Sequence, residues 1–284
     1  MTRLLDSISQ IADQFDTIVL DQWGVLHDGT TPYDGAIDAL QGLVSRGARL
    51  AVLSNSGKRS DLNAQRIAAK GFATDLFGCV MTSGEALWLD AAAGKLPGRR
   101  AYVVSANAMD AEQWADGLDL LFVTDLVQAD FVLIMGLPEG DGAPKPKALR
   151  DLRDAIVVRN IPTYCSNPDR TSPRAGGRLV VSPGALAHDI ADSGGSVTFY
   201  GKPHAPVFRA VELAMNVTPN RCLMVGDSLE HDIAGAANAG WQTLFIRGGI
   251  HAGVFQSNDV ETTLNELVTS KGTETPNFSL QSLR

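Results

Sequence analysis

Several features that would narrow the function at once are scarce or missing in this sequence. It has three cysteines, widely spaced and without a CxxC pair, which argues against a disulfide framework and a structural zinc site. Its formal net charge is −8 and no block is rich in Lys and Arg, so its overall field disfavours nucleic acid and membrane surfaces as partners. No apolar run approaches the ~20 residues of a membrane-spanning helix. The glycine-rich stretches lack GxGxxG and Walker spacings, so a nucleotide cofactor is not indicated.

The length and composition indicate a folded protein with a sizeable core. With 284 residues, of which 44% are hydrophobic, the chain suffices for one large domain or two modest ones. The N-terminal segment carries apolar side chains at helical spacing and no cleavage-like site, so we expect a docking helix and not a signal peptide. The tail from Lys271 is polar and aperiodic, which predicts a loose end. Cysteine usage favours a reducing, cytoplasmic location.

Short β-branched runs alternate with longer amphipathic segments, which is typical of βαβ units and a parallel sheet. A first series predicts strands and helices over residues 17–21, 34–46, 49–55, 61–70, 78–83 and 84–93. A second series predicts them over residues 100–106, 111–118, 121–126, 131–136, 147–160 and 162–167. A third series covers residues 197–203, 205–215, 221–227 and 243–249. The economical architecture is a Rossmann-like parallel-sheet α/β core of residues 1–96 and 197–284, with an α/β module at 97–196 inserted as a lid.

Polar residues that could take part in catalysis or bind phosphate follow the first two predicted strands. Asp21 comes directly after an apolar run, so we expect its carboxylate at the carboxyl edge of the sheet, where ligands of open α/β sheets bind. A single Asp at such a position is more often a turn or cap residue. The second strand ends in Ser54, Asn55 and Ser56, whose hydroxyls and backbone N–H groups suit a phosphoryl oxygen but are also ordinary in turns.

The third series adds a cation and two further acids. Lys202 follows a predicted strand, where its charge would offset those of Asp21 and a phosphate, although a lone lysine is usually a surface residue. Asp227 and Asp232 flank a strand-to-helix turn, an arrangement that suits a hard cation with oxygen ligands. Taken alone, Asp232 would be a first-turn acid favoured by the helix dipole. Four such elements, each at a strand end, are much more specific together than singly.

In this order the four elements resemble the four signatures of the haloacid dehalogenase (HAD) superfamily: an Asp nucleophile, a Ser or Thr, a Lys and a GDxxxxD acidic turn. The inserted module looks like the C2-type α/β cap of class IIA members, which include phosphatases acting on nucleotides, pyridoxal phosphate and p-nitrophenyl phosphate. Cys165–Asp169, with the sequence CSNPD, is similar to the ATNPD segment of those caps. The resemblance covers residues 16–250.

The resemblance implies a magnesium-dependent hydrolase of small phosphorylated metabolites. Asp21 would be the nucleophile and would form an aspartyl-phosphate. Mg²⁺ would be held by Asp21, the Trp23 carbonyl and Asp227, while Asp232 would support the metal or its waters. Dividing the displacement into two covalent steps beside a metal ion is chemistry that these groups can perform.

The remaining site residues carried over from the family would bind the substrate. Ser54 and the neighbouring amides, those of Asn55 and Ser56, would bind phosphate, and Lys202 would balance its charge. Asn167 and Asp169 of the cap-like segment are candidates for substrate contact, although a Ser-Asn-Pro-Asp turn also forms for its own sake. The lid would exclude water over the nucleophile. The same resemblance leaves open a homodimer formed through the caps.

The match to the family's phosphatases breaks at Trp23. Those enzymes have a second Asp there, which protonates the leaving group and then activates water, whereas indole has no proton that titrates near neutral pH. Losing such a group typically costs about 10² to 10⁴-fold in rate.

Three interpretations therefore remain open. The chain is a phosphatase, either with a good leaving group or with His27 or Asp28 as the acid. It is a dehalogenase that acts on 2-haloacids. The family's 2-haloacid dehalogenases also have an aromatic residue at the position of Trp23, but they need no metal. Or it is a non-catalytic protein that binds phosphorylated metabolites on the same scaffold.

Overall fold

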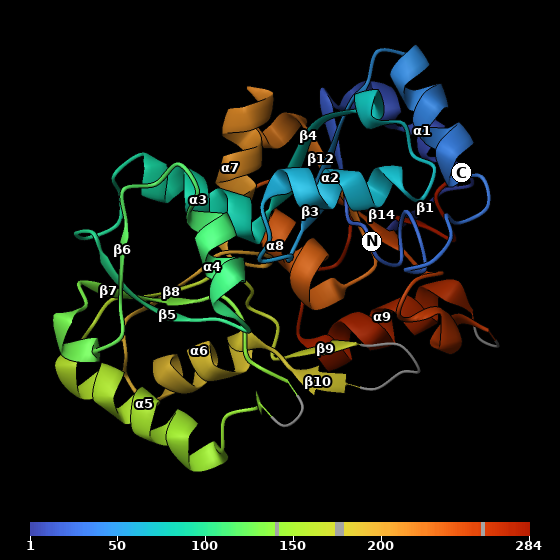
Figure 1. Ribbon diagram of the computed structural model, residues 1–284. Helices are drawn as coiled ribbons and strands as arrows, with labels where there is room; N and C mark the ends of the chain where they lie inside the picture. Colours follow the sequence, from blue (N-terminus) through green and yellow to red (C-terminus); the bar gives the residue numbers. More distant parts are fainter. Residues whose placement is uncertain (140–141, 174–178, 257–258) are drawn as a thin grey trace. The chain divides into compact units, whose positions relative to one another are not determined.

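The computed structural model describes residues 1–139, 142–173, 179–256 and 259–284 (Figure 1). Its chain forms two compact units, which we call the core unit and the inserted unit. The core unit comprises Met1–Ser54, Asp61–Met81 and Lys202–Arg284. The inserted unit comprises Asn55–Ser60 and Thr82–Gly201, so it includes the loop after β3 (Arg49–Ser54).

The core unit is built on a seven-stranded sheet in the order β1-β14-β13-β12-β2-β3-β4. The pairings from β1 across to β3 are all parallel. The strands are β1 (Arg3–Leu4), β2 (Thr17–Leu20), β3 (Arg49–Ser54), β4 (Phe77–Thr82), β12 (Cys222–Gly226), β13 (Gln242–Ile246) and β14 (Phe278–Leu280). Every residue of β2 and β12 is buried, which explains why both strands are continuous apolar runs without alternation.

Both faces of this sheet carry packed side chains. Successive residues of β13 divide between two apolar clusters: Leu244 and Ile246 pack with α1, whereas Phe245 packs with α9. The helices of the core unit are α1 (Ala36–Ser45), α2 (Ser60–Ala68), α7 (Ala205–Met215), α8 (Ala234–Asn238) and α9 (Val260–Lys271). Asp259 caps the start of α9 by accepting from Thr262 N. The sequence predicts α1, α2 and α7 close to these bounds, whereas α9 was not predicted.

The prediction of an N-terminal helix was wrong. The segment forms the strand β1 and two short 3₁₀ turns, Ile8–Gln10 and Ala12–Gln14. Apolar residues at helical spacing are buried as expected, among them Ile8 and Ile11. The capping box of Ser7 and Gln10 stabilises the first turn, and β1 is held by pairing with a strand at the other end of the chain. Such long-range pairing leaves no trace in local periodicity.

The C-terminal tail is likewise not a loose end. After α9 stops at Gly272, which has a φ of 61°, the chain returns to the sheet as β14 between β13 and β1. All three residues of β14 are buried, and Leu283 beyond them is fully enclosed. A strand of three residues is too short to show alternation, so sequence polarity misled the prediction.

The inserted unit has its own five-stranded parallel sheet in the order β11-β8-β7-β5-β6, together with an antiparallel pair. The strands of the sheet are β5 (Arg100–Val104), β6 (Leu121–Val123), β7 (Phe131–Ile134), β8 (Thr163–Cys165) and β11 (Val197–Phe199). The antiparallel pair is β9 (Thr171–Pro173) and β10 (Leu179–Val181). The sequence placed β11 at the start of the third, core series, but β11 pairs with β8, so it completes the second sheet.

Helices cover both faces of the second sheet (Figure 1). They are α3 (Ser83–Ala92), α4 (Ala108–Ala115), α5 (Pro146–Arg159) and α6 (Pro183–Asp192). In Figure 1, α5 and α6 lie on one side of the strands and α3 and α4 on the other. Buried Trp114 on α4 donates to Gly84 O on α3 at 2.7 Å, so the tryptophan joins the two helices. Within the described residues, no helix is long and apolar enough to cross a membrane.

Candidate active site

Asp21 lies at the carboxyl end of β2, in the middle of the core sheet. Its backbone N–H donates to Val225 O at 2.9 Å, which aligns the end of β2 with the end of β12. The next residue, Gln22, is buried and accepts from Asn63 Nδ2 at 2.9 Å. The carboxyl edge is therefore held from both the neighbouring strand and α2, as a preorganised site requires.

Asp227 and Asp232 come from the turn that follows β12. A single π-helical turn, Leu229–Ile233, precedes α8 and carries Asp232, whose Oδ2 accepts from Ser228 N at 3.0 Å. The close packing explains Gly226, because a Cβ there would lie 2.2 Å from Asp232 Cβ. Both acids are almost completely buried.

Lys202 joins these acids into one cluster. Its Nζ donates to Asp21 Oδ1 at 2.5 Å and to Asp232 Oδ1 at 2.6 Å, and the side chain is 4% exposed. One carboxylate oxygen from each of Asp21, Asp227 and Asp232 lies within 4.8 Å of the others. The structure thus brings together the nucleophile candidate, both turn acids and the amine.

Burial and the closeness of the acids raise the pKa values of two of them. Burial raises the pKa of Asp21 to about 6, although the nearby Lys202 ammonium opposes the shift. Burial, reinforced by repulsion from Asp21 and Asp232, raises the pKa of Asp227 to about 8. Burial alone would lower the pKa of Lys202, but Asp21 and Asp232 outweigh it and raise that pKa. The cluster therefore holds more negative charge than one ammonium balances.

The residues present fit a divalent metal ion. Three carboxylates and one ammonium leave a formal charge of −2 (−3 + 1) when all are ionised. Carboxylate oxygens are the ligands that Mg²⁺ and Ca²⁺ prefer. Asp227 also sits in a cradle of glycines, since a Cβ on Gly24 or Gly249 would lie 1.7 Å or 2.1 Å from its Oδ2. That oxygen accepts from Ile250 N at 2.8 Å, which fixes the carboxylate.

Sequence reasoning missed this cradle. Gly248 and Gly249 are not among the residues that the sequence predicts for the site. Their place directly after β13, the neighbour of β12, was the available signal, because carboxyl ends of adjacent parallel strands meet at one edge. Gly24, with a φ of 77°, is likewise absent from the predicted site residues.

Ser54 ends β3 beside β2 and is 9% exposed, so its position in the core unit agrees with the expected strand end. The residues that follow belong to the inserted unit. Asn55 Nδ2 donates to Asp169 Oδ1 at 2.9 Å, and Asn167 Oδ1 accepts from Asp169 N at 2.9 Å. Asn167 and Asp169 are thus brought together with Asn55 by direct hydrogen bonds.

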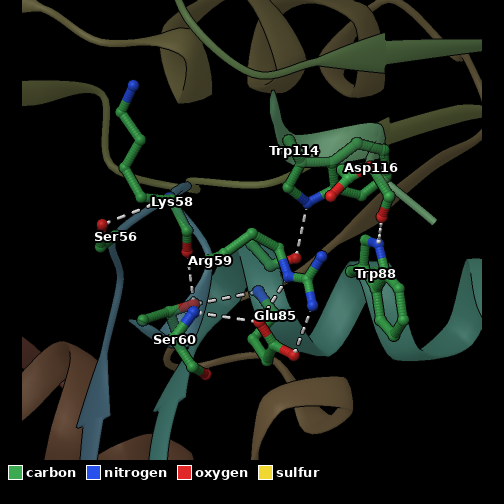
Figure 2. Close-up of polar contacts among 10 residues, drawn as sticks. Ser56, Lys58, Arg59, Ser60, Glu85, Trp88, Trp114 and Asp116 are labelled. Carbon is green, nitrogen blue, oxygen red and sulfur yellow. Dashed lines mark hydrogen bonds and ion pairs between the residues drawn. The ribbon is translucent and has the colours of Figure 1, made fainter. Parts of the chain in front are cut away.

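The loop from Asn55 to Ser60 is fastened to α3 (Figure 2). Arg59 and Glu85 form a two-point ion pair, with Nε–Oε2 and Nη2–Oε1 distances of 2.7 and 3.2 Å. Glu85 Oε2 also accepts from Ser60 N at 3.0 Å, while the Arg59 guanidinium lies 3.9 Å over the Trp88 ring. Lys58 pairs with Asp110 on α4 at 2.5 Å. Sequence analysis did not single out these anchors, since each pair spans distant segments.

The residues proposed to replace the missing acid have other partners. His27 is 1% exposed, and burial lowers its pKa to about 4. Asp28 Oδ1 accepts from Thr30 N and Thr31 N, both at 2.8 Å, which lowers its pKa and closes a turn. Trp23 itself is 54% exposed and meets the His27 ring edge-on.

Two family models match the sequence. A model of haloacid dehalogenase-like hydrolases matches residues 18–119, which include Asp21 and Ser54. A HAD-hydrolase-like model matches residues 199–266, which include Lys202, Asp227 and Asp232. The chain belongs to the haloacid dehalogenase superfamily. The resemblance inferred from the four motifs is thereby confirmed.

Known members of the superfamily align with nearly the whole chain. Human glycerol-3-phosphate phosphatase is 27% identical over 294 aligned residues, covering 94% of this chain and 88% of that protein. Ribonucleotide monophosphatase NagD of Escherichia coli K12 is 29% identical and covers 82% and 88%, respectively. A crystal structure of a haloacid dehalogenase-like hydrolase from Brucella suis 1330 superposes with a TM-score of 0.76 at 29% identity, over 99% of this chain and 100% of that one. The fold is therefore a haloacid dehalogenase core with an inserted α/β cap, as expected.

Proposed function

We propose that this chain is a magnesium-dependent phosphatase of small phosphorylated metabolites, of class IIA, which acts through an aspartyl-phosphate on Asp21. The observation that carries the proposal is the cluster of Asp21 with the buried Asp227, Asp232 and Lys202. Its relatives named as phosphatases of glycerol 3-phosphate and ribonucleotides support the same reaction class.

Each residue of the cluster has a separate task in this proposal. A carboxylate oxygen of Asp21 attacks phosphorus, and Lys202 Nζ holds that carboxylate ionised and in place. Asp21, Asp227 and the Trp23 carbonyl hold Mg²⁺, and Asp232 supports it. Bound magnesium supplies positive charge that offsets the phosphoryl oxygens.

In this proposal, the segment after the second strand binds the phosphate and a segment of the cap contacts the rest of the substrate. Ser54 and the amides of Asn55 and Ser56 bind the phosphate in this proposal, and Asn167 and Asp169 help to select the substrate. The hydrogen bond from Asn55 to Asp169 supports a common task for these residues. We assign the inserted unit the function of a cap that excludes water during the reaction. The cap boundaries at 97 and 196, a cytoplasmic location and a homodimer remain predictions.

A dehalogenase and a non-catalytic binding protein are the competing functions. The three-acid cluster disfavours the dehalogenase, because that reaction needs no metal ion. The retained nucleophile candidate Asp21, held by Lys202, disfavours a purely binding function.

One panel experiment separates the three. Purified protein is incubated with phosphorylated metabolites and 2-chloro acids, with and without Mg²⁺, and phosphate and chloride are measured. We expect magnesium-dependent phosphate release that Asp21→Asn abolishes and Asp28→Asn, a change in the exposed turn, does not. Metal-independent chloride release would establish the dehalogenase. Thermal stabilisation by a phosphorylated ligand without turnover would establish the binding protein.

A further inference from the structure

A short turn in the inserted unit carries two of the residues proposed to contact the substrate. It runs from Asn167 through Pro168 to Asp169, shortly after β8. Pro168 is buried, whereas Asn167 and Asp169 on either side of it are partly exposed. Within the turn, Asp169 N donates to Asn167 Oδ1 at 2.9 Å. The two polar side chains are therefore presented by a segment whose middle residue is packed inside the unit.

The start of α6 packs directly against this turn. A Cβ on Gly184 would lie 2.3 Å from Pro168 O and 2.5 Å from Asp169 O, so only glycine lets the helix approach this closely. Just before the helix, Ser182 N donates to Arg170 O at 3.0 Å. The beginning of the helix therefore contacts three consecutive residues of the chain, two of which belong to the turn.

His188 makes the polar contact between the body of α6 and the turn. It comes four residues after Gly184, on the same face of the helix, and its Nε2 lies 3.0 Å from Pro168 O. A carbonyl oxygen only accepts, so Nε2 carries a proton and donates. Burial, reinforced by the nearby Arg170, lowers the pKa of His188, so the ring is neutral at neutral pH. The ring is also stacked on Phe199, with 4.4 Å between centroids, which fixes the direction of its N–H group.

The same turn is bonded to the loop that follows β3. Asn55 Nδ2 donates to Asp169 Oδ1 at 2.9 Å. A Cβ on Gly57 would lie 2.8 Å from Ser166 Oγ, so this loop also packs against the residue that precedes the turn. A shift of Pro168 would therefore move Asp169 and disturb the segment proposed to bind phosphate.

We infer that His188 is a positioning residue for substrate binding, because its N–H group holds the Pro168 carbonyl. This bond sets where the two flanking side chains, Asn167 and Asp169, meet the substrate. The inference rests on the proposed phosphatase function, which assigns those side chains to the substrate. The nucleophile and the other acids of the metal cluster belong to the core unit, so loss of the bond should raise KM and leave kcat unchanged.

Two substitutions separate the N–H group of His188 from its ring. His188→Phe keeps a ring that can stack on Phe199 but has no donor, whereas His188→Gln keeps a neutral N–H donor and loses the ring. With phenyl phosphate and saturating Mg²⁺, we expect His188→Phe to raise KM about three- to tenfold, the effect of one lost hydrogen bond. KM of His188→Gln should stay within about twofold of wild type. In both variants kcat should change by less than about twofold.

Thr163→Val controls for general damage to the inserted unit. Thr163 Oγ1 donates to Ile161 O at 3.2 Å, and the residue is 1% exposed. Valine is close to threonine in shape but has no hydroxyl, so it also removes one bond to a backbone carbonyl. We expect KM to stay within about twofold, although thermal stability falls. Thermal unfolding shows whether each variant is folded; if His188→Phe is not, His188→Leu takes its place, since leucine also lacks a donor.

A double substitution tests whether His188 acts through the turn. Asp169→Leu removes the bond to Asn55 from the other side of the turn. If the two changes disturb the same turn, the increase in KM for Asp169→Leu combined with His188→Phe should fall clearly short of the product of the two single increases.

Each contrary result points to a different conclusion. If His188→Gln raises KM as much as His188→Phe, the ring and not its N–H group matters, and the positioning is refuted. An equal increase in Thr163→Val, a fall in kcat without a change in KM, or single increases that simply multiply would refute it too, while the phosphatase function stands. If the wild type releases no phosphate from phenyl phosphate or from any compound of the metabolite panel, the proposed function is itself refuted, and the positioning with it.

Discussion

Lys202 Nζ lies 2.5 Å from Asp21 Oδ1, although 181 residues of sequence separate the two. The same nitrogen donates to Asp232, so one buried cation contacts two carboxylates. Lys202→Met keeps much of the apolar stem but leaves the acids unpaired, which costs about 3 to 5 kcal/mol at a buried pair. We expect the free energy of unfolding, measured by urea denaturation, to fall by about 3 kcal/mol and phosphate release to be lost.

A second lysine provides the matched control. Lys58 pairs with Asp110 at the same 2.5 Å, but the two side chains are 35% and 31% exposed. Lys58→Met should therefore cost no more than about 1 kcal/mol. Similar losses for both lysine variants would show that burial does not set the strength of the Lys202 cluster.

Gly249→Ala should weaken magnesium binding without unfolding the protein. Its new Cβ would lie 2.1 Å from Asp227 Oδ2, so the carboxylate must move. We expect the Kd for Mg²⁺ to rise about tenfold or more, read from the magnesium-induced shift in thermal unfolding. Gly253→Ala is the control, because no atom lies within 4 Å of its added Cβ. An unchanged magnesium-induced shift in Gly249→Ala would show that the glycines around Asp227 do not affect magnesium binding.

Glu85 should make stability depend on acid pH. Burial raises its pKa, but the Arg59 ion pair and the Ser60 N–H outweigh burial and leave the pKa below the ordinary 4.5. A carboxyl whose pKa is lowered on folding stabilises the protein above its unfolded pKa, and this contribution is lost as pH falls through the folded value. Wild type should exceed Glu85→Gln by about 1 to 3 kcal/mol at neutral pH. Urea denaturation from pH 7 downward should show the gap closing below 4.5; a constant gap would contradict it.

Asp169 should act on the substrate through Asn55. Asp169→Asn retains an oxygen that can accept from Asn55 Nδ2, whereas Asp169→Leu cannot. We expect KM for phenyl phosphate to rise about fivefold in the Leu variant and to stay near wild type in the Asn variant. If both variants lose affinity equally, the negative charge of Asp169 itself contacts the substrate.

The central strands and their polar ends could be predicted because their signals are local. Thr17–Leu20 is buried on both faces of the sheet, and a strand buried in this way needs an uninterrupted apolar sequence. That apolar run ends at Asp21, so the sequence shows where the strand ends. The termini could not be predicted, since β1 and β14 contain two and three residues and depend on pairing with each other. The prediction placed β11 in the wrong sheet, because the sequence of a strand does not show which strand it pairs with.

The amino-acid sequence alone determined the kinds of chemical group and their order along the chain: an acid, a hydroxyl, an amine and an acidic turn, with tryptophan where an acid was expected. Only the tertiary structure decided that Asp21, Asp227 and Asp232 meet within 4.8 Å, that glycines crowd Asp227, and that His27 and Asp28 are committed elsewhere. Distances and pKa values arise from packing and burial, which many distant residues set jointly, and no local pattern records them.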